Sequence, residues 1–208
     1  MADQPRGRFI AIEGIDGSGT TLQTRALADW LCRRGFRVLE TREPSHGAIG
    51  RLIRERLAVR ATALDPVALA LLFAADRIDH VTCEVAPALE RGEVVLSDRY
   101  LLSSLAYQSL DCDAAWVREI NARAPEPDLT LVLEVPAEVA FARVQRRAAE
   151  GGAVEERFDA LALQQRIAGN YRRFRDGPGL GPTRVIDGAR PPELVTAALC
   201  AVLIELGL

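Results

Sequence analysis

The chain has 208 residues, of which 49% are hydrophobic and 26% charged, so it can bury a core and is not intrinsically disordered. Its formal net charge of −3 argues against a protein that coats nucleic acid, because that task needs a basic face. No apolar run approaches the roughly 20 residues that a membrane span needs. We therefore expect a soluble globular protein with neither a nucleic acid nor a membrane as partner.

In chain order, the hydrophobic pattern predicts strand 8–13, helix 20–34, strand 36–41, a helix around 49–57, helix 65–90, strand 93–97, a helix beginning near 101, strand 128–134, helix 136–149, helix 159–175, strand 184–186 and a helix after 192. Leu22 belongs to the expected apolar face of the first helix, and the long helix is expected to bend near Pro87. Strands that alternate with helices indicate an α/β fold, namely a five-stranded parallel sheet with helices on both faces. We expect one domain over 1–208.

The four cysteines are scattered along the chain, with neither a CxxC pair nor a histidine at metal-ligand spacing. The N-terminal residues lead into one short apolar stretch, which is too brief for a secretory signal. Reduced thiols in the cytoplasm are the expectation for this pattern.

The 26 basic residues are all arginines, and the chain contains no lysine. A genome biased against lysine codons is the simplest origin of this composition. Its chemical consequence is that any side-chain cation used here is a guanidinium, which has a planar fork of donors and no accessible neutral form.

A glycine-rich segment follows the first predicted strand: Gly14, Ile15, Asp16, Gly17, Ser18, Gly19, Thr20 and Thr21. It matches the P-loop pattern G-x-x-x-x-G-K-[ST] at every fixed position except the lysine. The glycines let backbone N–H groups point at phosphate oxygens, and the helix that opens at Thr20 adds its positive dipole end. We therefore expect these eight residues to bind ATP in a P-loop NTPase-like fold, with the Thr21 hydroxyl on Mg²⁺.

Thr20 occupies the lysine position and supplies no positive charge. Removing one preorganised donor typically costs about 3 kcal/mol, or ~10²–10³ in rate. An arginine finger contributes roughly 10³–10⁵, so a relocated arginine would offset that loss. The sequence leaves open whether water, an arginine or a cation fills the position.

Four motifs near the other strands indicate which family of P-loop proteins the chain resembles. Thr-Arg-Glu-Pro stands at 41–44, Leu-Phe-Ala-Ala-Asp-Arg at 72–77, Asp-Arg-Tyr at 98–100 and Pro-Asp-Leu-Thr at 127–130. In this order and at these spacings they resemble the thymidylate kinases, over nearly the whole chain. The resemblance implies transfer of the γ-phosphoryl group of ATP to dTMP with Mg²⁺, giving dTDP and ADP, in a protein that forms a homodimer.

The acceptor site is predicted from residues that follow the strands or share a helix face. Arg42 and Arg99 stand at adjacent strand ends, and arginine binds phosphate through paired N–H donors. Phe73 and Arg77 lie four residues apart and so share a helix face. Phe73 can stack the base while Arg77 donates to its carbonyl, although Phe73 taken alone would be interpreted as a core residue. By resemblance, the base and sugar of dTMP are also contacted by Ser103, Ser104 and Tyr107.

The predicted metal site combines Thr21 with two acidic residues. Asp98 directly follows an apolar strand and suits Mg²⁺ or its water shell, with a helix cap as the alternative interpretation. Asp16, inside the P-loop, is expected to take the sugar hydroxyl of dTMP or to help hold the metal.

The arginine-rich segment near 143–158 resembles the lid of the bacterial enzymes. Arg143 and Arg147 share a helix face, and the segment would close over ATP and exclude water. Arg157 is the first choice for the missing cation because the P-loop carries no charge of its own, as in relatives that place the catalytic arginine in the lid. The predicted catalytic residues are Arg99, Arg143, Arg147 and Arg157.

Two other functions stay open. One is a pseudokinase that binds nucleotide but lost turnover together with its lysine, and the complete set of acceptor residues argues against it. The other is a kinase for a different nucleoside or nucleoside monophosphate.

Overall fold

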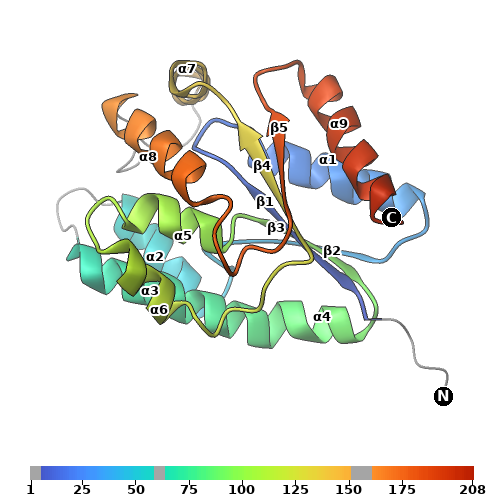
Figure 1. Cartoon of the computed structure of the whole chain (residues 1–208), viewed down its shortest axis with the longest axis horizontal. Helices are drawn as coiled ribbons and strands as arrows, with labels where there is room; N and C mark the ends of the chain where they lie inside the picture. The colour runs from blue at the N-terminus through green and yellow to red at the C-terminus, as the bar shows by residue number, and fades with distance from the viewer. Residues whose placement is uncertain (1–5, 59–63, 151–160) are drawn as a thin grey trace.

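A computed structural model describes residues 6–58, 64–150 and 161–208, and the strands in these ranges form one parallel sheet (Figure 1). In chain order they are β1 (Arg8–Glu13), β2 (Val38–Arg42), β3 (Val94–Asp98), β4 (Leu129–Glu134) and β5 (Thr183–Asp187). Their order in the sheet is β2-β3-β1-β4-β5, and every neighbouring pair is parallel. The predicted five-stranded parallel sheet is confirmed, with small shifts at the strand ends.

Helices connect the strands and cover both faces of the sheet (Figure 1). They are α1 (Thr20–Arg33), α2 (Ala48–Ala58), α3 (Pro66–His80), α4 (Ala86–Glu90), α5 (Leu101–Gln108), α6 (Ala114–Ile120), α7 (Ala137–Ala149), α8 (Leu161–Phe174) and α9 (Pro192–Glu205). The sequence pattern missed α6, a helix of seven residues capped by Asp113, whose side chain accepts from the Trp116 N–H.

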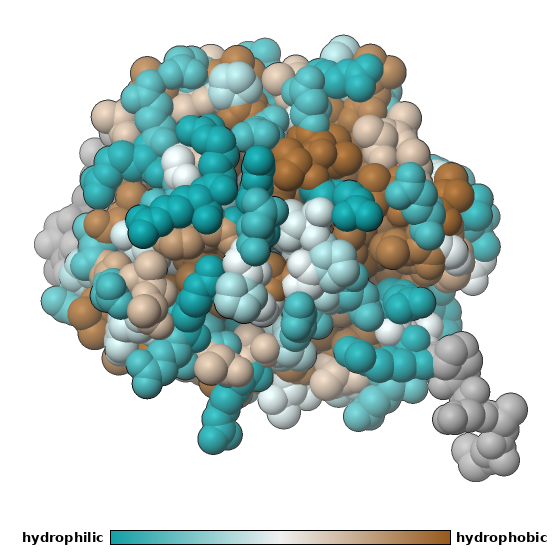
Figure 2. All heavy atoms as spheres, viewed as in Figure 1, coloured by the Kyte–Doolittle hydropathy of each residue, from teal (hydrophilic) through white to brown (hydrophobic). Residues whose placement is uncertain are grey.

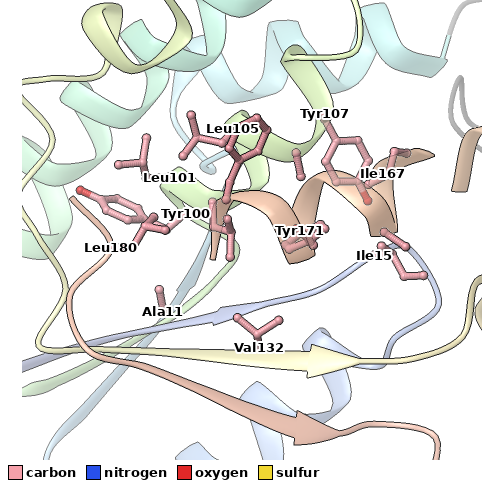
Figure 3. Packing of buried hydrophobic residues seen from close by; sticks show 14 of the residues in the cluster. Ala11, Ile15, Tyr100, Leu101, Leu105, Tyr107, Val132, Ile167, Tyr171 and Leu180 are labelled. Atoms are coloured by element: carbon pink, nitrogen blue, oxygen red, sulfur yellow. The ribbon is translucent and has the colours of Figure 1, made fainter. Parts of the chain in front are cut away.

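The two faces of the sheet carry separate hydrophobic clusters. Successive residues of a strand point to opposite faces, so Phe9 and Ala11 pack with α5 and α8, whereas Ile10 and Ile12 pack with α1 and α9. Figure 3 shows the first cluster, with side chains of α5 and α8 above Val132 of β4. Burial on both faces explains why the strands read as nearly continuous apolar runs.

The long helix predicted over 65–90 is regular at its start and changes pitch before Pro87. The Asp65 side chain accepts from two backbone N–H groups of the first turn, as an N-cap does. After α3, the turn Val81–Val85 (η2) is π-helical and leads into α4. The helix therefore departs from regular α-helical geometry in the turn directly before Pro87, next to the place predicted for a bend. A proline ring clashes with the carbonyl four residues earlier, here that of Cys83, and the wider π-turn accommodates it.

Leu22 corrects an expectation, because it is 54% exposed and lies outside the core. The first turn of α1 faces a cavity, and only later residues of the helix, such as Leu27 and Leu31, reach the sheet. Figure 2 shows hydrophobic residues in patches between extended hydrophilic side chains over the face seen in Figure 1. In the described ranges, no helix combines the length and the apolar composition needed to cross a membrane.

Candidate active site

A cavity of about 1190 Å³ opens where β1, β2 and β3 end. In open parallel sheets, ligands bind at the carboxyl ends of the strands, where the connecting loops meet. A pocket of roughly 300–1,000 Å³ takes one small ligand, so this cavity has room for two molecules side by side.

The cavity brings together most of the predicted site residues. Its lining includes Asp16, Gly17, Ser18, Gly19, Thr20, Thr21, Arg42, Phe73, Arg77, Asp98, Arg99, Ser103, Ser104, Tyr107, Arg143 and Arg147. Gly14 and Ile15 stand behind it, with the Ile15 side chain buried in the core. Arg157 and the rest of the predicted lid beyond residue 150 lie outside the described residues.

The phosphate loop has the backbone that its glycines permit. Gly17 and Gly19 have φ values of 83° and 96°, in the left-handed region that side chains disfavour. A Cβ on Gly17 would also lie 2.2 Å from the Ala140 carbonyl oxygen of α7. Among the described residues, α1 begins with neither a side-chain cap nor an acidic residue in its first turn. Its positive end is therefore available to an anion.

Thr20 carries no charge and is only 6% exposed, but two arginines contact the loop directly. Arg99 Nη1 donates to the Gly14 carbonyl at 2.9 Å, and Arg143 Nη1 approaches the Gly17 carbonyl at 3.4 Å. Arg143 also donates to the Gly188 carbonyl at 3.1 Å, so it joins α7 to the loop after β5. Positive charge therefore stands on both sides of the phosphate loop.

Thr21 and Asp98 meet where a cation would bind. Thr21 Oγ1 donates to Asp98 Oδ2 at 2.5 Å, and the buried Asp98 Oδ1 has no hydrogen-bond partner among the described residues. The alternative of a helix cap for Asp98 is wrong, because α5 has Tyr100 at its N-cap position and no side-chain cap. In the described ranges, no group of three or more His, Cys, Asp or Glu residues is arranged to hold a metal ion. The hydroxyl of Thr21 and the unpartnered oxygen of Asp98 fit Mg²⁺, which takes few protein ligands and fills its shell with phosphate and water.

Arg99 is the centre of a polar network that borders the cavity. Its φ of 77° is strained for a residue with a side chain, and such strain gathers at functional sites. Nη1 donates to the Tyr171 hydroxyl at 3.3 Å in addition to the Gly14 carbonyl, and Nη2 donates to Asp16 Oδ1 at 2.6 Å. Burial opposes the charge of Arg99, but Tyr107, Asp16 and Tyr171 together raise its pKa well above the ordinary value.

Glu13 and Tyr171 lie beneath Arg99, and the sequence analysis missed both. Glu13 accepts the N–H groups of Tyr100 at 2.8 Å and Ser103 at 3.1 Å, the Ser103 hydroxyl at 2.6 Å and the Tyr171 hydroxyl at 3.0 Å. Burial raises the pKa of this carboxyl, opposed by Ser103 and by the charge of Arg99. The signal that pointed to Glu13 in the sequence was a carboxylate at the end of an apolar strand. Tyr171 carried no signal, since it lies 158 positions from Glu13 in the sequence, on α8.

The sequence analysis also missed an arginine beside Arg42. Arg54 of α2 donates to the carbonyls of Pro44 at 2.7 Å and Ser45 at 2.6 Å, and its side chain lines the cavity. Burial and the charge of Arg42 lower the pKa of Arg54. Arg42 Nε is buried with no hydrogen-bond partner among the described residues. Two guanidiniums that repel each other, with one donor unused, are suited to an anion.

Arg77 is almost fully buried, with 1% of its surface exposed, and most of its donors are taken. Nη2 donates to Glu43 at 2.6 Å and at 3.0 Å to both the Tyr100 carbonyl and the Ser104 hydroxyl, while Nη1 donates to Asn121. Nε has no partner among the described residues. The N–H groups left for a base are therefore Nε and the second N–H of Nη1, since Nη1 has one acceptor only in the described ranges.

Several further residues of the cavity carried no recognisable signal in the sequence. They come from α1, α7 and the loop after β5: Gln23, Arg25, Glu138 and Arg190.

The comparisons with known proteins agree with each other. A family model described as thymidylate kinase matches residues 12–195. A probable thymidylate kinase of Pyrococcus abyssi is 42% identical over 177 residues, covering 82% of this chain and 84% of that protein. A probable thymidylate kinase of Pyrobaculum aerophilum is 41% identical over 196 residues, covering 94% and 95%. The thymidylate kinase of Thermomicrobium roseum is 42% identical over 204 residues, covering 95% and 94%.

Proposed function

The chain belongs to the thymidylate kinase family, and we propose that its cavity aligns ATP and dTMP for direct phosphoryl transfer. The enzyme phosphorylates dTMP to dTDP, a step of dTTP synthesis. The family assignment does not favour a pseudokinase or a kinase for another monophosphate. The observation that carries the proposal is that a phosphate loop and a cluster of arginines from other strand ends face one cavity.

ATP is assigned to the half of the cavity formed by α1, α7 and the loop after β5. The P-loop amides and the start of α1 would hold its phosphates, and Arg143 would border the nucleoside. Thr21 and Asp98 would hold Mg²⁺, which supplies charge neutralisation for the transferring phosphoryl group. Arg147 lies on the same helix and lines the same half.

The acceptor dTMP is assigned to the half formed by α2, α3 and α5. Arg42 and Arg54 would bind its phosphate, since both are cationic and Arg42 has a free buried donor. Phe73 would stack the base, with Arg77 Nε, Ser103, Ser104 and Tyr107 around the base and sugar. The Arg99 contact assigns the carboxylate of Asp16 to orienting that cation, in addition to the sugar or metal role expected from its position.

Catalysis in this arrangement is alignment and charge stabilisation. The attacking oxygen of dTMP already belongs to a phosphate, so no general base is needed. Arg99, between the two halves, would bridge the acceptor phosphate and the transferred group. Arg157 remains our choice for the charge that Thr20 lacks, within a lid near 143–158 on a single domain of 208 residues.

The test is ADP release measured by a coupled assay with dTMP, dUMP, dCMP and thymidine as acceptors. The proposal expects dTMP to give the highest kcat/KM, and an absence of ADP release with every acceptor would overturn it.

A separate set of variants tests which group supplies the positive charge that Thr20 lacks. Arg157→Ala should lower kcat by about 10³, as expected for an arginine finger. Thr20→Lys should change kcat little in the native background and restore part of it in Arg157→Ala. Arg33→Ala, at the exposed end of α1 and outside the cavity lining, is the control. Full turnover in Arg157→Ala would remove this arginine from the mechanism.

A homodimer is also proposed, through the outer face of α3. Val67, Leu71 and Ile78 of this helix are 46%, 48% and 42% exposed. Apolar residues on one helix face that find no cover in the monomer are typical of a subunit interface. The cytoplasm is the proposed location, in keeping with ATP as substrate.

A further inference from the structure

A buried polar cluster lies behind the acceptor half of the cavity and has no part in the mechanism above. Its centre is His80, the last residue of α3, whose side chain is fully buried. His80 Nε2 lies 2.7 Å from Thr41 Oγ1, and Nδ1 lies 3.3 Å from Glu43 Oε1. Glu84 completes the cluster, with Oε2 3.1 Å from Thr41 Oγ1 and 3.7 Å from His80 Nε2.

The π-turn of the long helix begins directly after His80 and includes Glu84. A π-turn makes the helix wider and is frequent at functional sites. Here it coincides with the point where two polar side chains of the helix reach the end of β2. Burying polar groups costs free energy unless they are hydrogen-bonded, whereas apolar side chains would pack this helix on the sheet without that cost. Packing alone therefore does not account for the polar cluster.

Glu43 connects this cluster to the acceptor site. One of its oxygens, Oε1, faces His80, and the other, Oε2, accepts from Arg77 Nη2 at 2.6 Å. All three side chains are at most 3% exposed. The orientation of Arg77, and with it the direction of the unpartnered Nε, therefore depends on where Glu43 is held.

The same cluster holds the backbone on both sides of Arg42. Thr41 and Glu43 are the neighbours of Arg42 in the chain, and both contact His80. Side chains alternate along an extended segment, so anchoring these two residues on one side presents Arg42 on the other. There Arg42 lines the cavity.

We propose that His80 is a positioning residue for the acceptor nucleotide: through Glu43 it orients Arg77 toward the pyrimidine base, and through Thr41 and Glu43 it presents Arg42 to the acceptor phosphate. This inference rests on the proposed placement of dTMP. It assigns His80 no contact with either substrate and no part in binding ATP.

The test compares two His80 variants with a matched control. His80→Phe keeps a ring and removes both polar contacts, whereas His80→Gln keeps one amide donor and acceptor. Loss of a hydrogen bond to a charged group changes affinity by roughly tenfold or more, so His80→Phe should raise the KM for dTMP about tenfold. The KM for ATP should stay within about twofold, and His80→Gln should restore most of the dTMP affinity. The control is His46→Phe, because His46 is the other histidine of the chain and is exposed; it should change neither KM.

An equal rise in both KM values, or an unchanged KM for dTMP, would overturn the inference. If His80→Phe does not fold, Thr41→Val removes the hydroxyl on the other side of the same contact and should raise the KM for dTMP selectively. A double-mutant cycle of His80→Phe with Arg77→Lys adds a readout that a merely structural role would not move. Because His80 acts through Arg77, their effects on dTMP affinity should be non-additive.

Arg77→Lys alone separates this inference from the proposed function. If Arg77→Lys leaves dTMP affinity unchanged, the placement of the acceptor base is wrong. If Arg77→Lys weakens dTMP binding while His80→Phe does not, the acceptor site stands and the role of His80 is rejected.

Discussion

Arg99 Nη2 lies 2.6 Å from Asp16 Oδ1, so the cation at the end of β3 is tied to the phosphate loop at the end of β1. The backbone of Arg99 is in the left-handed region, with φ at 77°, and the Asp16 contact is one of those that hold it there. A guanidinium held in place before its substrates arrive loses little freedom when they bind. The pair is therefore preorganised to link the proposed donor and acceptor halves of the cavity.

Asp16→Asn tests this link. The amide keeps the shape of the side chain but removes the negative partner of Arg99. Because the pair is partly buried, with side chains 17% and 20% exposed, we expect kcat/KM to fall roughly tenfold. Steady-state rates with dTMP and ATP measure the effect. Glu93→Gln, which breaks the ion pair with the half-exposed Arg91, is the control and should leave the rates unchanged. Equal rates in Asp16→Asn and the native enzyme would show that Arg99 needs no such partner.

Asp98→Asn tests the cation site. Loss of the carboxylate should lower kcat by about 10²–10³ and move the Mg²⁺ requirement to higher concentration, because transition-state charge is then less well compensated. Thr21→Val should act in the same direction, since its hydroxyl donates to Asp98 Oδ2. Activity is measured across a Mg²⁺ titration. An Asp98→Asn enzyme with the native Mg²⁺ dependence would place the cation elsewhere.

Glu13→Gln should change how stability depends on pH. Burial raises the pKa of Glu13 in the folded state above its unfolded value near 4.5, so between these two values the folded state binds more protons than the unfolded state. The stability contribution of this group therefore falls as pH rises from 4.5 to the raised pKa and is constant above it. The glutamine side chain cannot ionise and avoids that loss.

The measurement is the difference in Tm between Glu13→Gln and the native protein from pH 4 to 8. It should shift in favour of the variant as pH rises through this window. A difference that is flat with pH would mean that the Glu13 carboxyl titrates alike in the folded and unfolded states.

Leu71→Asp tests the proposed dimer. Leu71 is 48% exposed on α3, and a carboxylate there would have to be buried unpaired in the interface. We expect sedimentation equilibrium to change from the dimer mass to the monomer mass. Leu194→Asp on α9, at a leucine 46% exposed, is the matched control and should leave the mass unchanged. A monomeric native protein, or a Leu71→Asp dimer, would reject this interface.

Local patterns were enough for the sheet, and they predicted the phosphate loop. A strand buried on both faces must be apolar throughout, and a phosphate loop needs glycines at fixed spacing, so both leave signals within a few residues. The same reasoning failed for Leu22, where it judged a helix by its periodicity alone. Whether an apolar side chain is buried depends on what lies opposite it, and the first turn of α1 faces the cavity.

By itself, then, the sequence determined the α/β fold and predicted a phosphate loop with Thr20 in its lysine position, and most of the site residues that it predicted line one cavity. Only the tertiary structure revealed how these residues support each other: Tyr171 reaches Glu13 across 158 positions, and His80 reaches Glu43 across 37. Such contacts depend on how strands and helices pack in space, and residues so far apart leave no periodic or spacing signal in a single chain.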